Sequence, residues 1–265
     1  MAFRDNSLLI RSSSVVGIGT NDADDVYVAA GATTFVFADG NVGDDSFLGF
    51  DSNDTIITRV QIYDRNGDNF ISAGPNGIID IDRTGPGFDG NDHILIAGRN
   101  DEITELRYLG TKDGGFAYAD GGTLRALWTR FGQENVVEGT VANDRLDMAG
   151  GAKILLQDNA LGLNLGGDTI ANFGSDDLLV TTSALFDGNG DGTIGFARNR
   201  VLDMSGVGGP DVTDAEAGSG GQLRFTGSSL RSIEYLGSDD IDGVTYYYYG
   251  TAGSTFVPGS VDPTA

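Results

Sequence analysis

The sequence contains no cysteine, few prolines and a single histidine. Without cysteine, disulfides, thiolate metal sites and cysteine nucleophiles are excluded. Only 5 of the 265 residues are Pro, against 42 Gly, and the Gly residues follow no collagen-like period. This balance favours many tight turns and few helices. Hydrophobic residues make up 39% of the chain, which is enough to build a core and argues against disorder.

Lysine and glutamate are also scarce, and aspartate dominates the charge. The chain has 39 acidic and 16 basic residues, a net charge of −23, and only six of the acids are Glu. Asp tolerates turns and holds its carboxylate close to the backbone, as a calcium loop requires. So negative a chain would be repelled by nucleic acid and anionic membranes. A halophile-type acidic surface is the alternative explanation.

Long apolar runs are missing, so no membrane span is expected. The first ten residues lack the apolar core and cleavage motif of a signal peptide. The chain is therefore expected to be either cytoplasmic or exported by a route that needs no N-terminal signal. An exported chain without disulfides needs another source of stability, and bound metal is the usual one.

What is present is an internal repeat. Residues 45–80 align without a gap with residues 168–203. Outside this block, Asn21-Asp22 aligns with Asn143-Asp144, and Tyr108-Leu109-Gly110 aligns with Tyr235-Leu236-Gly237. The repeat predicts two tandem similar domains, residues 1–121 and 122–265.

Short apolar runs bounded by Gly, Asn and Asp predict β-strands throughout. The clearest runs are residues 33–37, 55–62, 78–81, 94–96, 178–180 and 246–249. Residues 124–131 are the best helix candidate because their large apolar side chains recur at helical spacing. This helix is either a connector between the two domains or a core element of the second. The sequence thus predicts an all-β fold.

The strongest local motif is an Asp-x-Asn-x-Asp loop in each copy. Its side-chain oxygens at positions 1, 3 and 5 and its main-chain carbonyl at position 7 can surround one face of a calcium ion. These positions are Asp64, Asn66, Asp68 and Phe70 in the first copy, and Asp187, Asn189, Asp191 and Thr193 in the second. The alternative is an Asx-rich turn that binds no metal.

The loops depart from the EF-hand pattern at position 12. The bidentate Glu of an EF-hand is replaced there by Pro75 in the first copy and by Arg198 in the second. Further oxygens must therefore come from elsewhere in the chain. Asp80 and Asp203, which align with each other in the repeat, are the candidates, together with Asp82.

A second motif, residues 87–95, matches the calcium-binding nonapeptide GGxGxDxUx except at Phe88. In a β-roll, the Gly-rich half of such a repeat turns the chain and the Asp faces calcium between the rungs. This assigns Asp92 as a calcium ligand. Partial copies of the motif at residues 43–47 and 166–170 add Asp45 and Asp168.

Residues 45–54 and 168–177 both read Asp-x-(Phe/Ile)-x-x-Phe-x-x-x-Asp. In this they resemble segments near the C-termini of RTX (hemolysin-type) calcium-binding proteins. The resemblance implies type I secretion to the cell surface or medium, and folding triggered by external calcium. Because tandem nonapeptides are absent, the expected fold is two tandem all-β domains, each an irregular parallel β-helix or β-roll-like coil. The alternative is a calcium-laced β-sandwich.

Catalytic signatures are missing from the sequence. His93 is the only histidine, and neither a Gly-x-Ser-x-Gly elbow nor an HExxH motif occurs. A glycosidase-type carboxylate pair stays open, because Asp is abundant and pairing is not visible in a sequence. What the two copies share is turn and metal chemistry, so we expect a protein that is not an enzyme.

The functional expectation is a non-catalytic, calcium-binding structural protein of the bacterial cell surface that self-assembles into a layer or filament. Its expected partners are copies of itself and cell-surface polysaccharide. A secreted calcium-dependent adhesin or carbohydrate-binding module is the alternative, and an enzyme accessory or hydrolase domain is a third. The tyrosines at 246–249 would expose one pair unless something covers the strand, giving either a self-association surface or an edge strand packed by the tail.

Overall fold

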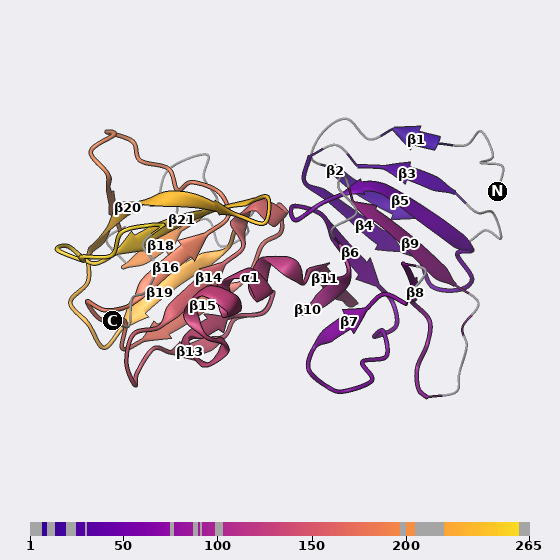
Figure 1. Ribbon diagram of the computed structural model, residues 1–265, viewed down its shortest axis with the longest axis horizontal. Coiled ribbons are helices and arrows are strands. Elements are labelled where there is room, and N and C mark those ends of the chain that lie inside the picture. The colour runs from indigo at the N-terminus through magenta and orange to yellow at the C-terminus, as the bar shows by residue number, and fades with distance from the viewer. Residues whose placement is uncertain are drawn as a thin grey trace. The chain divides into compact units, whose positions relative to one another are not determined.

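The computed structural model describes residues 7–9, 14–19, 25–29, 31–74, 77–86, 90, 92–98, 103–196, 200–204 and 220–259. The chain forms two compact units, Met1–Gly122 (unit 1) and Thr123–Ala265 (unit 2). Strands dominate both units, which confirms the all-β class (Figure 1). The predicted helix is also confirmed, as α1 (Gly122–Phe131). No helix in the described part of the chain is long and apolar enough to cross a membrane.

Unit 1 consists of two sheets. The five-stranded sheet has the order β1-β3-β5-β9-β8, formed by Ser7–Leu9, Val26–Val28, Asp44–Phe50, His93–Gly98 and Ile78–Asp80. The six-stranded sheet has the order β2-β4-β6-β11-β10-β7, formed by Ser14–Ile18, Thr33–Phe37, Thr55–Thr58, Gly115–Asp120, Glu105–Lys112 and Phe70–Ser72. The first six strands therefore alternate between the two sheets along the chain.

These alternating strands pair in parallel. Val26 of β3 lies opposite Ser7 of β1 on one side and Ser46 of β5 on the other. In the second sheet, β2, β4 and β6 are parallel in the same way. Each circuit of the chain thus places one strand in each sheet. Antiparallel strands complete both sheets, with β8 beside β9, and β11, β10 and β7 following β6.

Unit 2 has two sheets with the same succession of directions. Its six-stranded sheet has the order β12-β14-β16-β21-β20-β17, formed by Val136–Glu138, Ile154–Gln157, Leu178–Thr181, Val244–Gly250, Ser232–Ile241 and Thr193–Gly195. Its four-stranded sheet has the order β13-β15-β19-β18, formed by Arg145–Asp147, Gly167–Ala171, Gln222–Thr226 and Val201–Asp203. Two 3₁₀ helices, η1 (Gln133–Asn135) and η2 (Asn159–Leu161), lie in connections. In both six-stranded sheets, three parallel strands precede three antiparallel ones.

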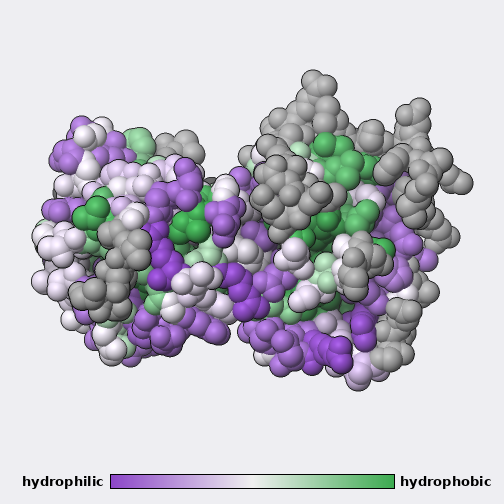
Figure 2. Space-filling view, in the orientation of Figure 1, coloured by the Kyte–Doolittle hydropathy of each residue, from purple (hydrophilic) through white to green (hydrophobic). Residues whose placement is uncertain are grey.

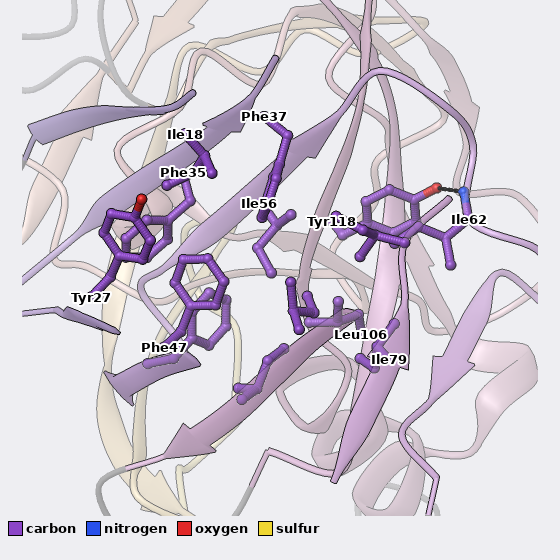
Figure 3. Packing of buried hydrophobic residues seen from close by; sticks show 14 of the residues in the cluster. Ile18, Tyr27, Phe35, Phe37, Phe47, Ile56, Ile62, Ile79, Leu106 and Tyr118 are labelled. Atoms are coloured by element: carbon purple, nitrogen blue, oxygen red, sulfur yellow. Dashed lines mark hydrogen bonds between the residues drawn. The ribbon is translucent and has the colours of Figure 1, made fainter. Parts of the chain in front are cut away.

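The core of each unit lies between its two sheets. In unit 1, the rings of Tyr27 and Phe47 stack at 5.3 Å, and Phe35 meets Phe47 edge-on at 4.5 Å. Figure 3 shows these side chains converging from strands of both sheets. In unit 2, Phe173 and Phe225 make a similar edge contact at 5.2 Å. Each fully buried large side chain contributes about 1.5–3 kcal/mol, so these clusters hold the paired sheets together.

The β10–β11 and β20–β21 hairpins share one irregularity. The register of β10 shifts between Tyr108 and Gly110, and that of β20 shifts between Tyr235 and Gly237. The two glycines have φ angles of 109° and 129°, which side chains with a Cβ rarely adopt. The repeated Tyr-Leu-Gly tripeptide is therefore a β-bulge in both units.

Two sequence expectations are wrong. The strand expected over residues 55–62 ends at Thr58, where the Thr58 hydroxyl donates to the Val60 carbonyl at 2.6 Å and the chain turns. The tyrosines at 246–249 do not form an exposed self-association surface, because Tyr246 and Tyr248 are fully buried. The tail does pack on this strand, as the alternative expected, with the Phe256 ring 5.0 Å from the ring of Tyr248. Strand β21 lies between β16 and β20, so it is not an edge strand.

Candidate metal centre

The first Asp-x-Asn-x-Asp loop leads into β7 and is braced by its own side chains. The Asp64 carboxylate accepts three main-chain N–H groups, from Asn66 at 3.1 Å, Gly67 at 2.9 Å and Asn69 at 2.7 Å. The Asn66 side-chain amide donates to Asp68 Oδ2 at 2.9 Å. These hydrogen bonds hold the side chains at positions 1, 3 and 5 close to one another. Figure 2 shows strongly hydrophilic residues along the lower edge of unit 1, below the place where Figure 1 shows β7.

The second loop, which leads into β17, repeats these hydrogen bonds donor by donor. Asp187 accepts from the N–H groups of Asn189 at 3.2 Å, Gly190 at 2.9 Å and Gly192 at 2.7 Å. The Asn189 amide donates to Asp191 Oδ2 at 3.0 Å. Asp68 and Asp191 also accept the N–H of position 7, Phe70 at 2.9 Å and Thr193 at 2.8 Å. The two loops therefore have the same conformation.

Positions 4 and 6 explain the residue types between the acids. Gly67 and Gly190, at position 4, have φ angles of 72° and 70°. At position 6, Asn69 has a φ of 68° and Gly192 a φ of 80°. Gly and Asn are the residues that adopt this left-handed region most readily. The Gly and Asn residues between the acids therefore allow the chain to form a tight loop.

The acids of these loops suit a hard cation. Asp187 is half-buried, and the N–H of Gly192 donating to it lowers the pKa of its carboxyl. The carboxylate is therefore charged at neutral pH. Each loop offers two carboxylates and one amide oxygen, the ligand types that calcium prefers.

Each loop is held by the bulged hairpin beside it. The N–H groups of Tyr108 and Tyr235 donate to the position-6 carbonyls of Asn69 and Gly192, both at 2.8 Å. The turn before each loop is tied to a second tyrosine of the hairpin. Ile62 N–H donates to Tyr118 Oη at 2.9 Å (Figure 3), and Leu185 N–H donates to Tyr249 Oη at 2.8 Å. The hairpin thus fixes both sides of the loop.

Asp45 and Asp168 lie at the second residues of β5 and β15, where they link neighbouring parallel strands. Asp45 Oδ1 accepts the N–H of Asp25 at 3.1 Å, and Asp168 Oδ1 accepts the N–H of Asp144 at 2.8 Å. Asp168 is 1% exposed, and its Oδ2 is buried without a hydrogen-bond partner. Burial, with the Asp144 charge adding to it, raises the pKa of Asp168 to about 7.

Asp92 has a similar role before β9. It is buried, and its Oδ1 accepts the N–H groups of Val42 at 3.0 Å and Gly43 at 3.3 Å. The neighbouring His93 places Nδ1 2.9 Å from Asp44 Oδ1. Residues 87–89 and 91 of the nonapeptide, and Pro75 and Arg198 at position 12 of the loops, lie outside the described residues.

Asp80 and Asp82 face Gly90. Asp80 lies in β8 of the five-stranded sheet, whereas the first loop leads into β7 of the six-stranded sheet. Asp80 Oδ2 accepts the Gly90 N–H at 2.8 Å, and a Cβ at Gly90 would lie 2.4 Å from Asp80 Oδ1 and 1.5 Å from Asp82 Oδ1. Burial raises the pKa of Asp80, and the nearby Asp82 adds to the effect. In unit 2, the aligned Asp203 accepts from the Gln222 amide at 3.3 Å.

Asp54 and Asp177 are structural residues to which the sequence analysis assigned no role. Asp54 is fully buried, and its two oxygens accept the N–H groups of Thr33 at 2.8 Å and Asp51 at 2.9 Å. Asp177 accepts in the same way from Lys153 at 2.8 Å and Gly174 at 2.7 Å. Burial raises the pKa of Asp54 to about 7. Their shared place at the end of the RTX-like segment is the signal that could have found them.

Within the described ranges, no group of three or more His, Cys, Asp or Glu side chains is placed to hold a metal ion. Each loop, with two carboxylates and an amide, would therefore supply only part of the coordination sphere of a calcium ion. The remaining oxygens would come from the main chain, from water or from other carboxylates.

Comparisons with known proteins give no relative. No family model matches the sequence, and neither a curated protein nor a solved structure is detectably similar to the chain. The resemblance to RTX proteins is therefore carried by the motif residues alone.

Proposed function

We propose that this chain is a non-catalytic, calcium-binding structural protein of the bacterial cell surface that self-assembles into a layer or filament. The observation that carries the proposal is the identity of the two loops, which make the same hydrogen bonds and dock on the same bulge. In both loops these hydrogen bonds hold carboxylate and amide oxygens close together, as a calcium site requires. We also propose that the protein is exported to the cell surface, as RTX proteins are.

Calcium fits the chemistry of the residues present. Asp64, Asn66 and Asp68, and their counterparts in unit 2, supply oxygen ligands at positions 1, 3 and 5. The buried Asp168 Oδ2, which has no hydrogen-bond partner, is an oxygen that a cation would satisfy. Bound calcium would neutralise part of the net charge of −23 and so favour the compact state.

We also propose that each unit is a short β-roll-like coil and that the two units are tandem copies of one domain. The parallel pairing of alternate strands, with Asp45 and Asp168 linking neighbouring strands, supports the coil. The common strand order of the six-stranded sheets and the common bulge support the duplication.

The test is a double variant, Asp64→Ala with Asp187→Ala. In the unaltered protein, calcium at 100 times its Kd should stabilise the fold by about 2.7 kcal/mol, and the double variant should lose this stabilisation. Thermal melting with calcium and with EDTA measures it. Asp39→Ala with Asp176→Ala, two exposed positions outside the loops, removes the same charge and should keep the calcium effect. An undiminished calcium shift in the loop variant would contradict the ligand assignment.

Assembly is followed on the same proteins by light scattering and electron microscopy. The unaltered protein and the charge-matched control should form a layer or filament in calcium that EDTA dissolves, and the loop variant should not. Unchanged particle size with and without calcium would remove the self-assembly part of the proposal.

An adhesin or carbohydrate-binding module is the second candidate, and unit 2 offers an observation in its favour. Phe186, directly before the loop, is 50% exposed, and Tyr235, which donates its N–H to the loop, is 43% exposed. Flat aromatic faces beside polar oxygens suit a sugar ring. Glycan-array binding by a monodisperse monomer would favour this function.

A further inference from the structure

The segment after β21, residues 251–259, packs on the outer side of the β20–β21 hairpin, and we call it the strap. The Phe256 ring lies 5.0 Å from the ring of Tyr248 and 6.2 Å from that of Phe131 in α1. The Gly259 N–H donates to Asp239 Oδ2 at 3.0 Å. Pro258 packs beside Gly237, where an added Cβ would lie 2.9 Å from the proline Cγ. The strap thus buries tyrosine surface that would otherwise face water.

Asp239 is the centre of the strap's binding site. It accepts donors from three segments: the Arg130 guanidinium of α1, the Tyr248 hydroxyl at 2.8 Å, and the Gly259 N–H. Arg130 and Asp239 side chains are only 17% and 18% exposed, and Arg130 also donates to Tyr248 Oη at 3.0 Å. We call Arg130, Phe131, Gly237, Asp239 and Tyr248 the clasp.

The strap is held in the clasp by ring packing and a main-chain hydrogen bond rather than by strand pairing. Among the described residues, the strap belongs to no strand, and Ser254 N–H donates within the strap, to Thr251 at 3.0 Å. The connection to β21 contains Gly253, which has a φ of 83° and open space around it. Such a segment can leave and re-enter its site without disturbing the sheets.

The strap is also suited by its lack of charge to approach another copy. Its nine residues, Thr-Ala-Gly-Ser-Thr-Phe-Val-Pro-Gly, include no charge in a chain whose net charge is −23. Like-charged surfaces of two copies repel each other, but an uncharged strap escapes most of this repulsion. In the clasp it would enter, the cation Arg130 is paired with Asp239, so the two charges offset each other.

Only unit 2 has the clasp among the described residues. In the matching register of the unit 1 hairpin, Lys112 takes the place of Asp239 and Ala117 takes the place of Tyr248. Each chain therefore offers one strap and one clasp. When the strap of one copy fills the clasp of the next, the contact is heterologous, and such contacts generate open polymers.

We propose that copies of this protein associate by strap exchange, with residues 251–259 of one copy seated in the clasp of a second. This inference rests on the proposed self-assembly and names the surface that carries it. Every contact made within one chain is then remade between two chains, so exchange needs no new complementary surface.

Engineered disulfides test the exchange against a cysteine-free background. A Cβ at Gly237 would lie 3.8 Å from Pro258 Cβ, the separation typical of a disulfide. Gly237→Cys is made in one protein and Pro258→Cys in another of different mass, and the two are mixed under oxidising conditions with calcium. Exchange predicts a disulfide-linked heterodimer. Gly110→Cys, at the equivalent bulge of unit 1, should give none with Pro258→Cys.

A second pair of variants avoids a side chain at the strained Gly237 position. Phe256→Ala removes the ring that fills the clasp and should abolish assembly. Val257 is 61% exposed, so Val257→Ala should leave assembly intact. Assembly of Phe256→Ala to the extent of the unaltered protein overturns the proposal. The proposal is also overturned if the Gly237→Cys/Pro258→Cys double variant forms only an intramolecular disulfide and the mixed single variants form no heterodimer.

The outcomes separate this inference from the proposed function. Calcium-dependent assembly without a heterodimer refutes strap exchange and leaves self-assembly standing. A heterodimer without calcium-dependent assembly supports exchange and refutes the calcium-driven layer. If neither the heterodimer nor calcium-dependent assembly appears, strap exchange and the proposed self-assembly are both wrong.

Discussion

Buried aspartates connect segments of this chain that are distant in sequence. Asp54 and Asp177 each accept one N–H from an earlier strand region and one from their own turn. A carboxylate can do this because both of its oxygens are acceptors, whereas an Asn side chain has one acceptor and one donor. The scarcity of Glu in the sequence follows in part from this role, since a longer side chain would not fit the same short span.

The raised pKa of Asp54, about 7, predicts a pH dependence. The unfolded value is about 3.9, so the protonated form is favoured in the folded state. Its contribution to the free energy of unfolding is therefore complete below pH 4 and falls as the pH rises to 7. Asp54→Asn cannot titrate, so the stability advantage of the unaltered protein over this variant should shrink across that window. Urea denaturation from pH 4 to pH 8 in EDTA measures it, and parallel curves would contradict the prediction.

At the scale of elements, the bulged hairpin and the acidic loop act as one structure. Tyr108 and Tyr235 hold the loop carbonyl through their N–H groups, and Tyr118 and Tyr249 hold the preceding turn through their hydroxyls. The tyrosines that the sequence presents as strand residues are thus supports for the candidate metal loops.

Tyr118→Phe tests this support. The variant leaves the buried N–H of Ile62 without its acceptor, so the free energy of unfolding should fall by about 1–3 kcal/mol. Tyr249→Phe, whose partner Leu185 is only half-buried, should cost about 1 kcal/mol. Chemical denaturation measures both, and Tyr247→Phe serves as the control. Equal stability of Tyr118→Phe and the unaltered protein would show that the hydroxyl does not hold the turn.

At the scale of the whole molecule, each unit has its own core and its own loop. The buried cluster of unit 1 contains residues from Ile18 to Tyr118, and that of unit 2 contains residues from Met148 to Tyr249. If calcium binds each loop, its effect on stability should therefore be local to one unit.

Single-loop variants test this independence. Asp187→Ala should remove calcium-dependent protection of main-chain amides in unit 2 and leave that of unit 1, and Asp64→Ala should do the reverse. Hydrogen exchange followed by mass spectrometry measures the protection of each unit. Loss of protection in both units from one substitution would contradict separate sites.

The distribution of Asp shows where sequence comparison fails. Asn21-Asp22 aligns with Asn143-Asp144 in sequence. Among the described residues, however, it is Asp25 that donates its N–H to Asp45, as Asp144 does to Asp168. Several Asp residues lie close together in residues 21–25, so similarity alone does not choose among them. The hydrogen bond to the next strand makes the choice.

The sequence by itself determined the β class, the helix α1 and the residues of the two acidic loops. These depend on local patterns: apolar runs between turn residues, helical spacing, and Gly or Asn at the left-handed positions. Only the tertiary structure decided that Asp54 and Asp177 clamp neighbouring segments and that Asp80 faces Gly90. It also decided that α1 and the strap pack on Tyr246 and Tyr248 of β21. Each of these depends on a contact between residues far apart in the chain, and no local pattern specifies which distant partner a buried carboxylate or ring will meet.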